Sequence, residues 1–229
     1  MVTPLRLAVF DVDGTLVDSQ HNIVAAMLVA CDAHGLCRPP ADAVRRVIGL
    51  SLVEAVAALL PEQEAIAHQR IAESYKDAFV TLRSGSGWTE PLFPGAVAAL
   101  DALEADGWAL GLATGKSRRG VDVMIERHGL TGRFATIQTP DTNPGKPNPA
   151  MLRSAMAEVG ADASATVMIG DTTFDILMAR AANTGAVAVG WGYHPVGELR
   201  AAGAHAVVED YAGLLIELAG EAGCARARS

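Results

Sequence analysis

Short apolar segments recur along the chain, and each is followed by a polar or turn-forming residue. The clearest occupy residues 5–10, 108–114, 166–171 and 186–191, and weaker ones occupy 134–138 and 206–208. Short apolar runs without regular polar alternation are typical of strands that are buried on both faces of a sheet. The pattern therefore predicts a set of buried, parallel strands.

Stretches with helical spacing of apolar residues lie between these segments. They cover residues 96–105, 118–128, 150–159 and 176–182. Strands that alternate with helices predict an α/β fold, in which a doubly wound, Rossmann-like parallel sheet is covered on both faces. Such sheets bind ligands in the crevice at the carboxyl ends of their strands. Polar residues that follow the strands are therefore the candidates for chemistry.

One long segment does not follow the alternation. From Asp18 to about Leu82 the apolar residues keep helical spacing, with no strand-like run between them, and residues 84–95 are rich in Gly, Ser and Pro. We interpret residues 18–89 as a small all-helical domain with its hinges. Residues 1–17 and 90–229 then form the catalytic core.

Charge and composition limit the function. The chain has 229 residues, half of them apolar, and a net charge of -8. This charge argues against a protein that binds the nucleic-acid backbone, which requires clustered Lys and Arg. The three cysteines show no zinc-ligand spacing, and the N-terminal apolar run is too short for a signal peptide or a membrane span. We expect a cytoplasmic protein without nucleic-acid or membrane partners, as a monomer or homodimer.

Two carboxylates follow the first predicted strand. Asp11 and Asp13 are two positions apart, and Gly14 allows the chain to turn after them. One carboxylate of such a pair can attack phosphorus, while the other acts as general acid and base. The same residues also fit an ordinary Asp-Gly turn, so the pair alone does not decide the function.

A second group of polar residues follows the strand at 108–114. Thr114, Gly115 and Lys116 lead into a helix, where a hydroxyl group and free amides can hold phosphate oxygens. An ordinary capped helix start would look similar. The stretch GLATGKS is one residue short of a nucleotide-binding P-loop, which we therefore reject.

The remaining candidates are a lysine and two further carboxylates. Lys146 lies in a proline-rich turn, and Asp171 and Asp175 are one helical turn apart after the strand at 166–171. A fixed ammonium group can neutralise a nucleophilic carboxylate and a phosphate. Asp171 can supply a carboxylate to Mg²⁺, and Asp175 can orient the lysine or the waters of the metal.

Taken together and in this order, DVDGT, Thr-Gly, GKPNP and GDTTFD resemble the motifs of the haloacid dehalogenase superfamily. The resemblance covers nearly the whole chain. It implies Asp11 as nucleophile, Asp13 as acid and base, and Lys146 as catalytic lysine. It also implies a Mg²⁺ site made by Asp11, Asp171 and the backbone carbonyl of Asp13, supported by Asp175, with Thr114, Gly115 and Lys116 holding the substrate.

The helical insertion resembles the cap domain of the phosphoglycolate phosphatase and phosphomutase branch. This resemblance implies closure over the active site about hinges near Leu16–Ser19 and Gly85–Pro94. It also suggests that Arg45 or Arg46 binds a substrate carboxylate. Solvated arginines on a helix surface remain an equal alternative.

We therefore predict a magnesium-dependent phosphatase that hydrolyses a small phosphorylated metabolite, such as phosphoglycolate, through an aspartyl-phosphate. The alternatives are a pyrophosphatase and a sugar-phosphate mutase on the same core. Mutases of this branch resemble one another in a hinge histidine and a cap arginine, at positions that correspond to Ile23 and Leu52 here. A dehalogenase is disfavoured because Asp13 and Asp171 make a metal phosphate site rather than a halide cradle. A non-catalytic binding protein is disfavoured because no catalytic group is missing.

Overall fold

The central feature of the fold is a parallel β-sheet. The computed structural model describes residues 5–85 and 87–226, so the ends of the predicted core domain lie outside the described residues. Within the described residues, six strands pair in parallel in the order β3-β2-β1-β4-β5-β6. Their bounds are β1 Arg6–Phe10, β2 Trp108–Ala113, β3 Thr136–Gln138, β4 Thr166–Gly170, β5 Gly185–Val189 and β6 Ala206–Val208.

Alternate side chains of each strand enter two different apolar clusters. In β1, Ala8 and Phe10 belong to one cluster, whereas Leu7 and Val9 belong to the other. This separation follows from the two-residue period of a strand, which points successive side chains to opposite faces. Because both faces are buried, the strands are apolar throughout, as the sequence pattern predicted.

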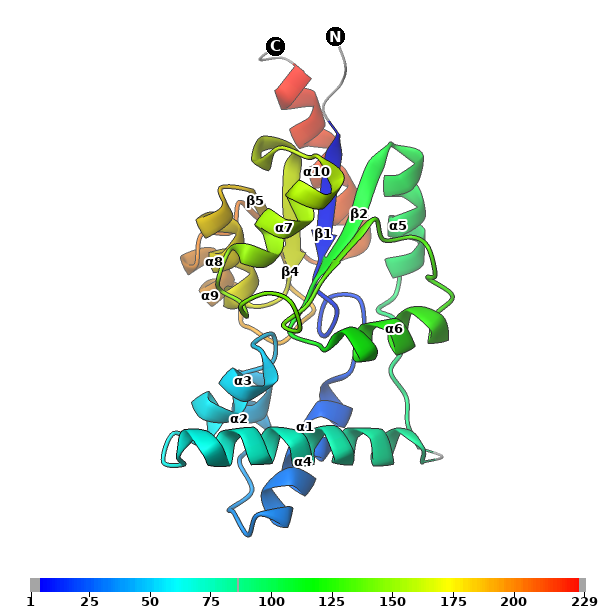
Figure 1. Cartoon of the computed structure of the whole chain (residues 1–229). Helices are drawn as coiled ribbons and strands as arrows, with labels where there is room; N and C mark the ends of the chain where they lie inside the picture. The colour runs from blue at the N-terminus through cyan, green and yellow to red at the C-terminus, as the bar shows by residue number, and fades with distance from the viewer. Residues whose placement is uncertain (1–4, 86, 227–229) are drawn as a thin grey trace.

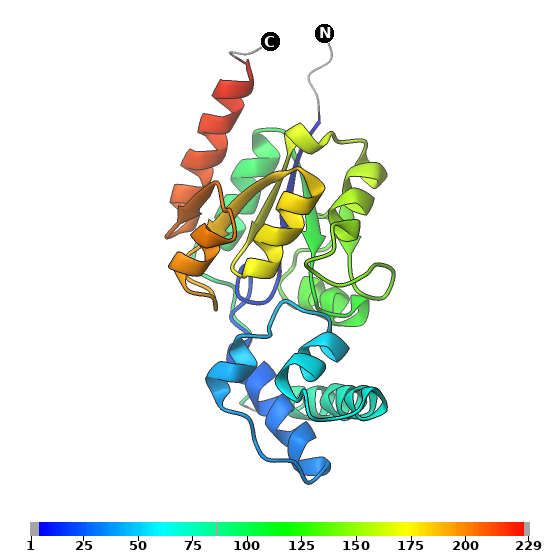
Figure 2. The same ribbon diagram turned by 90° about the vertical axis from the view of Figure 1, so that its left-hand side faces the viewer.

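Helices cover both faces of the sheet (Figure 2). The cluster that contains Phe10 includes residues of α5 (Ala96–Ala105), α6 (Arg118–Arg127) and α10 (Tyr211–Arg226). The other cluster includes residues of α7 (Ala150–Val159), α8 (Thr173–Ala182) and α9 (Val196–Ala201). A short 3₁₀ turn, Ala163–Ala165, precedes β4. The prediction of a doubly wound α/β fold is confirmed.

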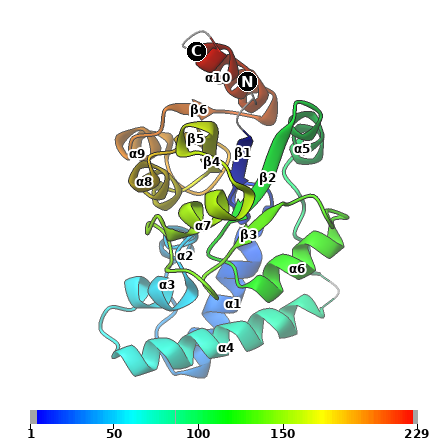
Figure 3. The ribbon, with the colours of Figure 1, turned by 45° about the horizontal axis from the view of Figure 1, so that its top comes forward.

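Four further helices lie beyond the carboxyl ends of the strands, at the bottom of Figure 1. They are α1 (Gln20–Ala33), α2 (Ala41–Arg45), α3 (Leu52–Leu59) and α4 (Ala65–Arg83). They enclose a separate apolar cluster that includes Met27, Val56 and Ile71. We call these helices and their loops the cap, and Figure 3 shows α4 crossing beneath α1 and α3. The exact limits, 18 and 89, remain predictions from the sequence.

The two connections between cap and core run side by side. Phe93 N–H donates to Leu16 O at 2.9 Å, and Asp18 N–H donates to Pro91 O at 2.9 Å. Val17 and Leu92 form an antiparallel bridge between them. The predicted hinges therefore contact each other directly.

One helix begins earlier than its apolar spacing suggested. The spacing indicated 176–182, whereas α8 starts at Thr173. Thr172 and Asp175 form a capping box, in which each side chain bonds to the backbone of the other residue and so extends the first turn. In the part of the chain that the structure describes, no helix combines the length and apolarity needed to cross a bilayer.

Candidate active site

The carboxyl ends of three adjacent strands bring the predicted site residues together. Asp11 and Asp13 follow β1, Thr114 follows β2, and Asp171 follows β4. The two neighbours of β1 in the sheet are β2 and β4, although they are far apart in the sequence. Parallel pairing therefore places these side chains at one edge, where ligands of such sheets bind.

Lys146 lies between two carboxylates at this edge. Its Nζ atom is 2.9 Å from Asp11 Oδ1 and 2.5 Å from Asp175 Oδ1, and all three side chains are buried. Burial lowers the pKa of Lys146, but the charges of Asp11 and Asp175 outweigh it and leave that pKa raised. The ammonium group therefore stays protonated next to the candidate nucleophile.

Asp175 is fixed by the start of α8. Its second oxygen accepts hydrogen bonds from Thr172 N at 3.0 Å and from Thr172 Oγ1 at 2.7 Å. The capping box thus orients Asp175, and Asp175 in turn orients Lys146. This geometry agrees with the supporting role that was predicted for Asp175.

Asp171 is also held at both oxygens. It accepts from Thr15 Oγ1 at 2.9 Å and from Tyr193 N at 2.9 Å. Gly14 has a φ of +90°, and a Cβ atom there would lie 2.3 Å from Asp171 Oδ2. Only glycine combines this backbone conformation with this close approach, which explains the turn residue after Asp13.

Asp13 contacts a different cation from Asp11. Lys116 Nζ lies 2.8 Å from Asp13 Oδ1, and Ser19 Oγ donates to the same oxygen at 2.6 Å. Lys116 Nζ is also 4.0 Å from Glu90. Burial lowers the pKa of Lys116, whereas the charges of Asp13 and Glu90 raise it, and the pKa is raised overall. Lys116 was predicted to bind substrate, and in this structure it pairs with the candidate acid and base.

A cavity of about 470 Å³ separates the cap from the core. We call it the cap cavity. Its core side includes five of the predicted residues, which are Asp11, Asp13, Thr114, Gly115 and Lys116. Residues predicted from two separate motifs, after β1 and after β2, are thus brought to one cavity. Lys146 is not part of the lining and contacts Asp11.

Arg45 is placed elsewhere. Its guanidinium donates to Gln20 Oε1 at 2.8 Å and pairs with Asp42, and Arg45 is not part of the cavity lining. Arg46 pairs with Glu198 of the core at 2.8 Å. A role for Arg45 in binding substrate has no support from this geometry and remains a prediction.

Comparison with known proteins agrees with this arrangement. The sequence profile of a family described as "Haloacid dehalogenase-like hydrolase" matches residues 8–189. The chain belongs to this family. The match includes the first motif, the cap and every strand except the last, so the resemblance seen in the sequence is confirmed.

Relatives and solved structures of this hydrolase match over most of their length. A "Probable phosphatase IndB" from Dickeya dadantii is 34% identical over 90% of both chains. A "Phosphoglycolate phosphatase" from Mesorhizobium japonicum is 31% identical over 93% of this chain and 94% of its own. The structure of a hydrolase from Pseudomonas syringae superposes with a TM-score of 0.84 at 29% identity, covering 94% and 98% of the two chains.

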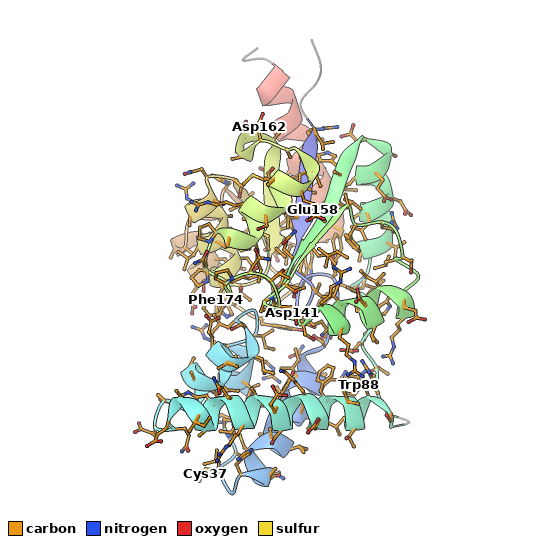
Figure 4. All side chains as sticks on the ribbon, viewed as in Figure 1. Cys37, Trp88, Asp141, Glu158, Asp162 and Phe174 are labelled. Atoms are coloured by element: carbon orange, nitrogen blue, oxygen red, sulfur yellow. The ribbon has the colours of Figure 1, made fainter. Side chains whose placement is uncertain are left out.

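The cap of the hydrolase is in direct contact with the core. A Cβ atom on Gly115 would lie 2.3 Å from the backbone oxygen of Leu50, in the loop between α2 and α3. His194 Nε2 lies 3.1 Å from Arg46 O, so the core loop after β5 contacts the same part of the cap. Phe174 and Asp141, labelled in Figure 4, lie at this boundary. The α2–α3 loop of the cap therefore contacts the core beside the site.

The carboxylates of the hydrolase fit a divalent cation. Asp11, Asp171 and Asp175 offer oxygen atoms within 4.8 Å of one another, and Asp11 Oδ2 is buried without a hydrogen-bond partner among the described residues. Burial raises the pKa of Asp11 to about 7 and the pKa of Asp171 well above its ordinary value. A cation would offset this accumulation of negative charge, and oxygen donors are those that Mg²⁺ prefers.

Of these three residues, Asp175 is the poorest ligand, because it accepts three hydrogen bonds, one from Lys146 and two from Thr172. Asp171 accepts one at each oxygen, and Asp11 Oδ2 accepts none from the described residues. The carboxylate of Asp13 faces Lys116 and Ser19. This orientation leaves only the backbone carbonyl of Asp13 for the metal, which is the atom that the resemblance implied.

Sequence reasoning assigned no role to four residues that hold the site. Thr15 and the backbone of Tyr193 fix Asp171, Ser19 fixes Asp13, and Glu90 lies beside Lys116. Thr15 is part of the DVDGT motif, and Ser19 and Glu90 lie in the hinges, so their positions offered a signal. Tyr193 holds Asp171 through its backbone N–H, a contact that no residue type reveals, and its hydroxyl accepts from Ser19 N at 3.2 Å.

Lys146→Met is expected to lower the free energy of unfolding by about 3–5 kcal/mol, because it leaves buried carboxylates without their partner. Lys76→Met, which removes an exposed ion pair with Glu73, is the matched control and is expected to cost less than about 1 kcal/mol. Urea unfolding of both variants measures the difference. Equal losses would contradict the central role of Lys146.

Proposed function

We propose that this hydrolase is a magnesium-dependent phosphatase that hydrolyses a small-molecule phosphomonoester through an aspartyl-phosphate on Asp11. The observation that carries the proposal is the placement of Asp11. Its free, buried oxygen lies at the cap cavity, with Lys146 on one side and Asp171 on the other. The relatives named as phosphatases support the reaction class.

In the first step, Asp11 would attack phosphorus as the phosphoester bond to the leaving group breaks. Asp13, held at the cavity by Ser19 and Lys116, would donate a proton to the departing oxygen. In the second step, Asp13 would take a proton from water, which attacks the aspartyl-phosphate and releases inorganic phosphate and free Asp11. When bound, Mg²⁺ would neutralise charge on the phosphoryl oxygens.

Thr114 and Gly115 are suited to orient the phosphoryl group. Thr114 is buried, lines the cavity and also accepts a hydrogen bond from Lys116 N at 3.2 Å. Gly115 exposes its backbone at the start of the segment that leads into α6. The closed cap would exclude bulk water during the transfer.

A mutase is the less favoured alternative. Ile23 and Leu52, which correspond to the histidine and arginine positions of the mutases, both line the cap cavity. Their apolar side chains offer no group that binds the second phosphate of a sugar bisphosphate or takes part in proton transfer. Two cap cations, Lys76 and Arg83, line the cavity, so pyrophosphate stays a second candidate. Among small esters, phosphoglycolate is suggested by the names of relatives.

Asp11→Asn is expected to lower kcat by about 10³-fold or more, because a carboxamide is a poor nucleophile. Phosphate release from a panel of phosphoesters, measured with Mg²⁺ and then with chelator, provides the assay. Asp162→Asn is the matched control, since Asp162 is exposed at the opposite end of the sheet (Figure 4). Turnover by Asp11→Asn at the rate of this control would contradict the covalent mechanism.

Mg²⁺ is expected to raise the melting temperature by about 5 °C or more at 100 times its Kd, since it binds the folded carboxylate site and not the unfolded chain. Asp171→Asn is expected to lose most of this shift, because it removes a proposed ligand. Differential scanning calorimetry with and without Mg²⁺ measures both proteins. The same shift in wild type and variant would exclude Asp171 as a ligand.

A further inference from the structure

The cap side of the cap cavity is mainly apolar, with Ser51, Lys76 and Arg83 as its polar members. Its lining includes Ile23 and Met27 from α1, Ile48 and Leu52 from around the α2–α3 loop, and Tyr75 and Phe79 from α4. The core side, by contrast, supplies the carboxylates, Thr114 and Lys116. A phosphoester bound with its phosphoryl group on the core therefore points its leaving group at an apolar surface.

Two aromatic rings shape this surface. The rings of Tyr75 and Phe79 have centroids 5.8 Å apart, and Trp88 packs edge-on against Phe79 at 4.8 Å. Lys116 Nζ lies 5.3 Å from the centre of the Phe79 ring. Contacts with Tyr75, Trp88 and Lys116 thus fix the position of the Phe79 ring. Fixed aromatic faces favour contact with a flat or ring-shaped group.

The Tyr75 hydroxyl adds a polar atom to the same surface. Its environment is buried, and its pKa is raised well above the ordinary value by burial and then by the charges of Asp13 and Glu90. It makes no hydrogen bond with any described residue. Because Tyr75 lines the cap cavity, its hydroxyl is available to a bound molecule.

Two of the four positive side chains that line the cavity are engaged by carboxylates of the protein. Lys116 is engaged by Asp13, and Lys76 pairs with Glu73. Arg119 is exposed, and Arg83 is the last residue of α4. Arg45, the predicted carboxylate ligand, does not line the cavity. A two-carbon acid such as glycolate would thus meet apolar side chains on the cap.

The volume of the cavity also favours a leaving group that is larger than glycolate. Its volume of about 470 Å³ lies within the range of about 300–1,000 Å³ in which pockets enclose drug-sized ligands. The phosphoryl group and a two-carbon leaving group would leave much of the apolar surface uncovered.

We propose that the leaving group of the substrate is an alcohol with an apolar, ring-sized body, which packs against Tyr75, Phe79 and Leu52 when the cap is closed. This inference rests on the proposed phosphatase function. It assigns selectivity to the apolar cap surface rather than to a cap arginine.

The test compares three phosphomonoesters of primary alcohols, which are ethyl phosphate, 2-phenylethyl phosphate and phosphoglycolate, in the presence of Mg²⁺. Ethyl and 2-phenylethyl phosphate have leaving groups of similar acidity, so their ratio of kcat/KM reports the binding of the ring. We expect 2-phenylethyl phosphate to exceed each of the other two by about 10-fold or more, since burial of a few apolar carbons is worth that much in discrimination.

Two variants locate the effect. Phe79→Leu, which keeps an apolar side chain but removes the ring, is expected to lower the ratio of 2-phenylethyl to ethyl phosphate by about 3-fold or more. Phe134→Leu makes the same change at a core residue outside the cavity and is expected to keep the ratio of the wild type. An unchanged ratio in Phe79→Leu would overturn the assignment of this surface.

The outcomes separate the two proposals. Hydrolysis of ethyl phosphate or phosphoglycolate at least as efficient as that of 2-phenylethyl phosphate would overturn the inference about the leaving group and leave the phosphatase intact. Absence of Mg²⁺-dependent phosphate release from all three esters would overturn the proposed function itself.

Discussion

The ammonium group of Lys146 lies between Asp11 and Asp175 in a fully buried site, with a third carboxylate, Asp171, close to both. One fixed positive charge does not balance three carboxylates that burial has removed from water. The fold maintains this arrangement by holding each group separately. The capping box of α8 fixes Asp175, and Thr15 and Tyr193 fix Asp171. A divalent cation would supply the missing positive charge and would thereby also favour the binding of an anionic phosphoryl group.

A second, less buried set of charges connects the active site to the cap. Lys116 bridges Asp13 and Glu90, and Glu90 lies in the linker that returns from the cap. Trp88 Nε1 donates to Glu90 at 3.0 Å, and the Trp88 ring packs against Phe79 of α4. The proposed acid and base is therefore connected through Lys116 to Glu90, and through Glu90 and Trp88 to the apolar surface that would select the leaving group.

The sequence was sufficient to predict the parallel sheet and to predict which polar residues lie at the carboxyl ends of its strands. Strands buried on both faces give short apolar runs, and the residues that follow those runs meet because parallel strands end at one edge. Asp11, Asp13, Thr114 and Asp171 could be placed in this way, whereas Lys146 was selected from a proline-rich turn and Asp175 from its spacing to Asp171. Capping explains the one clear error of helix length, since Thr172 extends α8 beyond its apolar spacing.

The cap was less predictable because side-chain partners there depend on tertiary packing. Arg45 was chosen from its position in a loop-like motif, but its partners are Gln20 and Asp42. The pairing of Lys116 with Asp13 joins residues 103 positions apart. Neither the partners of Arg45 nor the pairing of Lys116 can be predicted from the spacing of residues along the sequence. The apolar lining of the cavity likewise becomes evident only when α1 and α4 are placed over the core.

The most direct test of the account is to trap the covalent intermediate. The enzyme is quenched during turnover with Mg²⁺ and a hydrolysed phosphoester, treated with borohydride, digested and analysed by mass spectrometry. Borohydride reduces an aspartyl-phosphate to homoserine, and the account predicts this conversion at position 11 only when substrate is present. Turnover without modification at Asp11, or with modification at another carboxylate, would contradict Asp11 as the nucleophile.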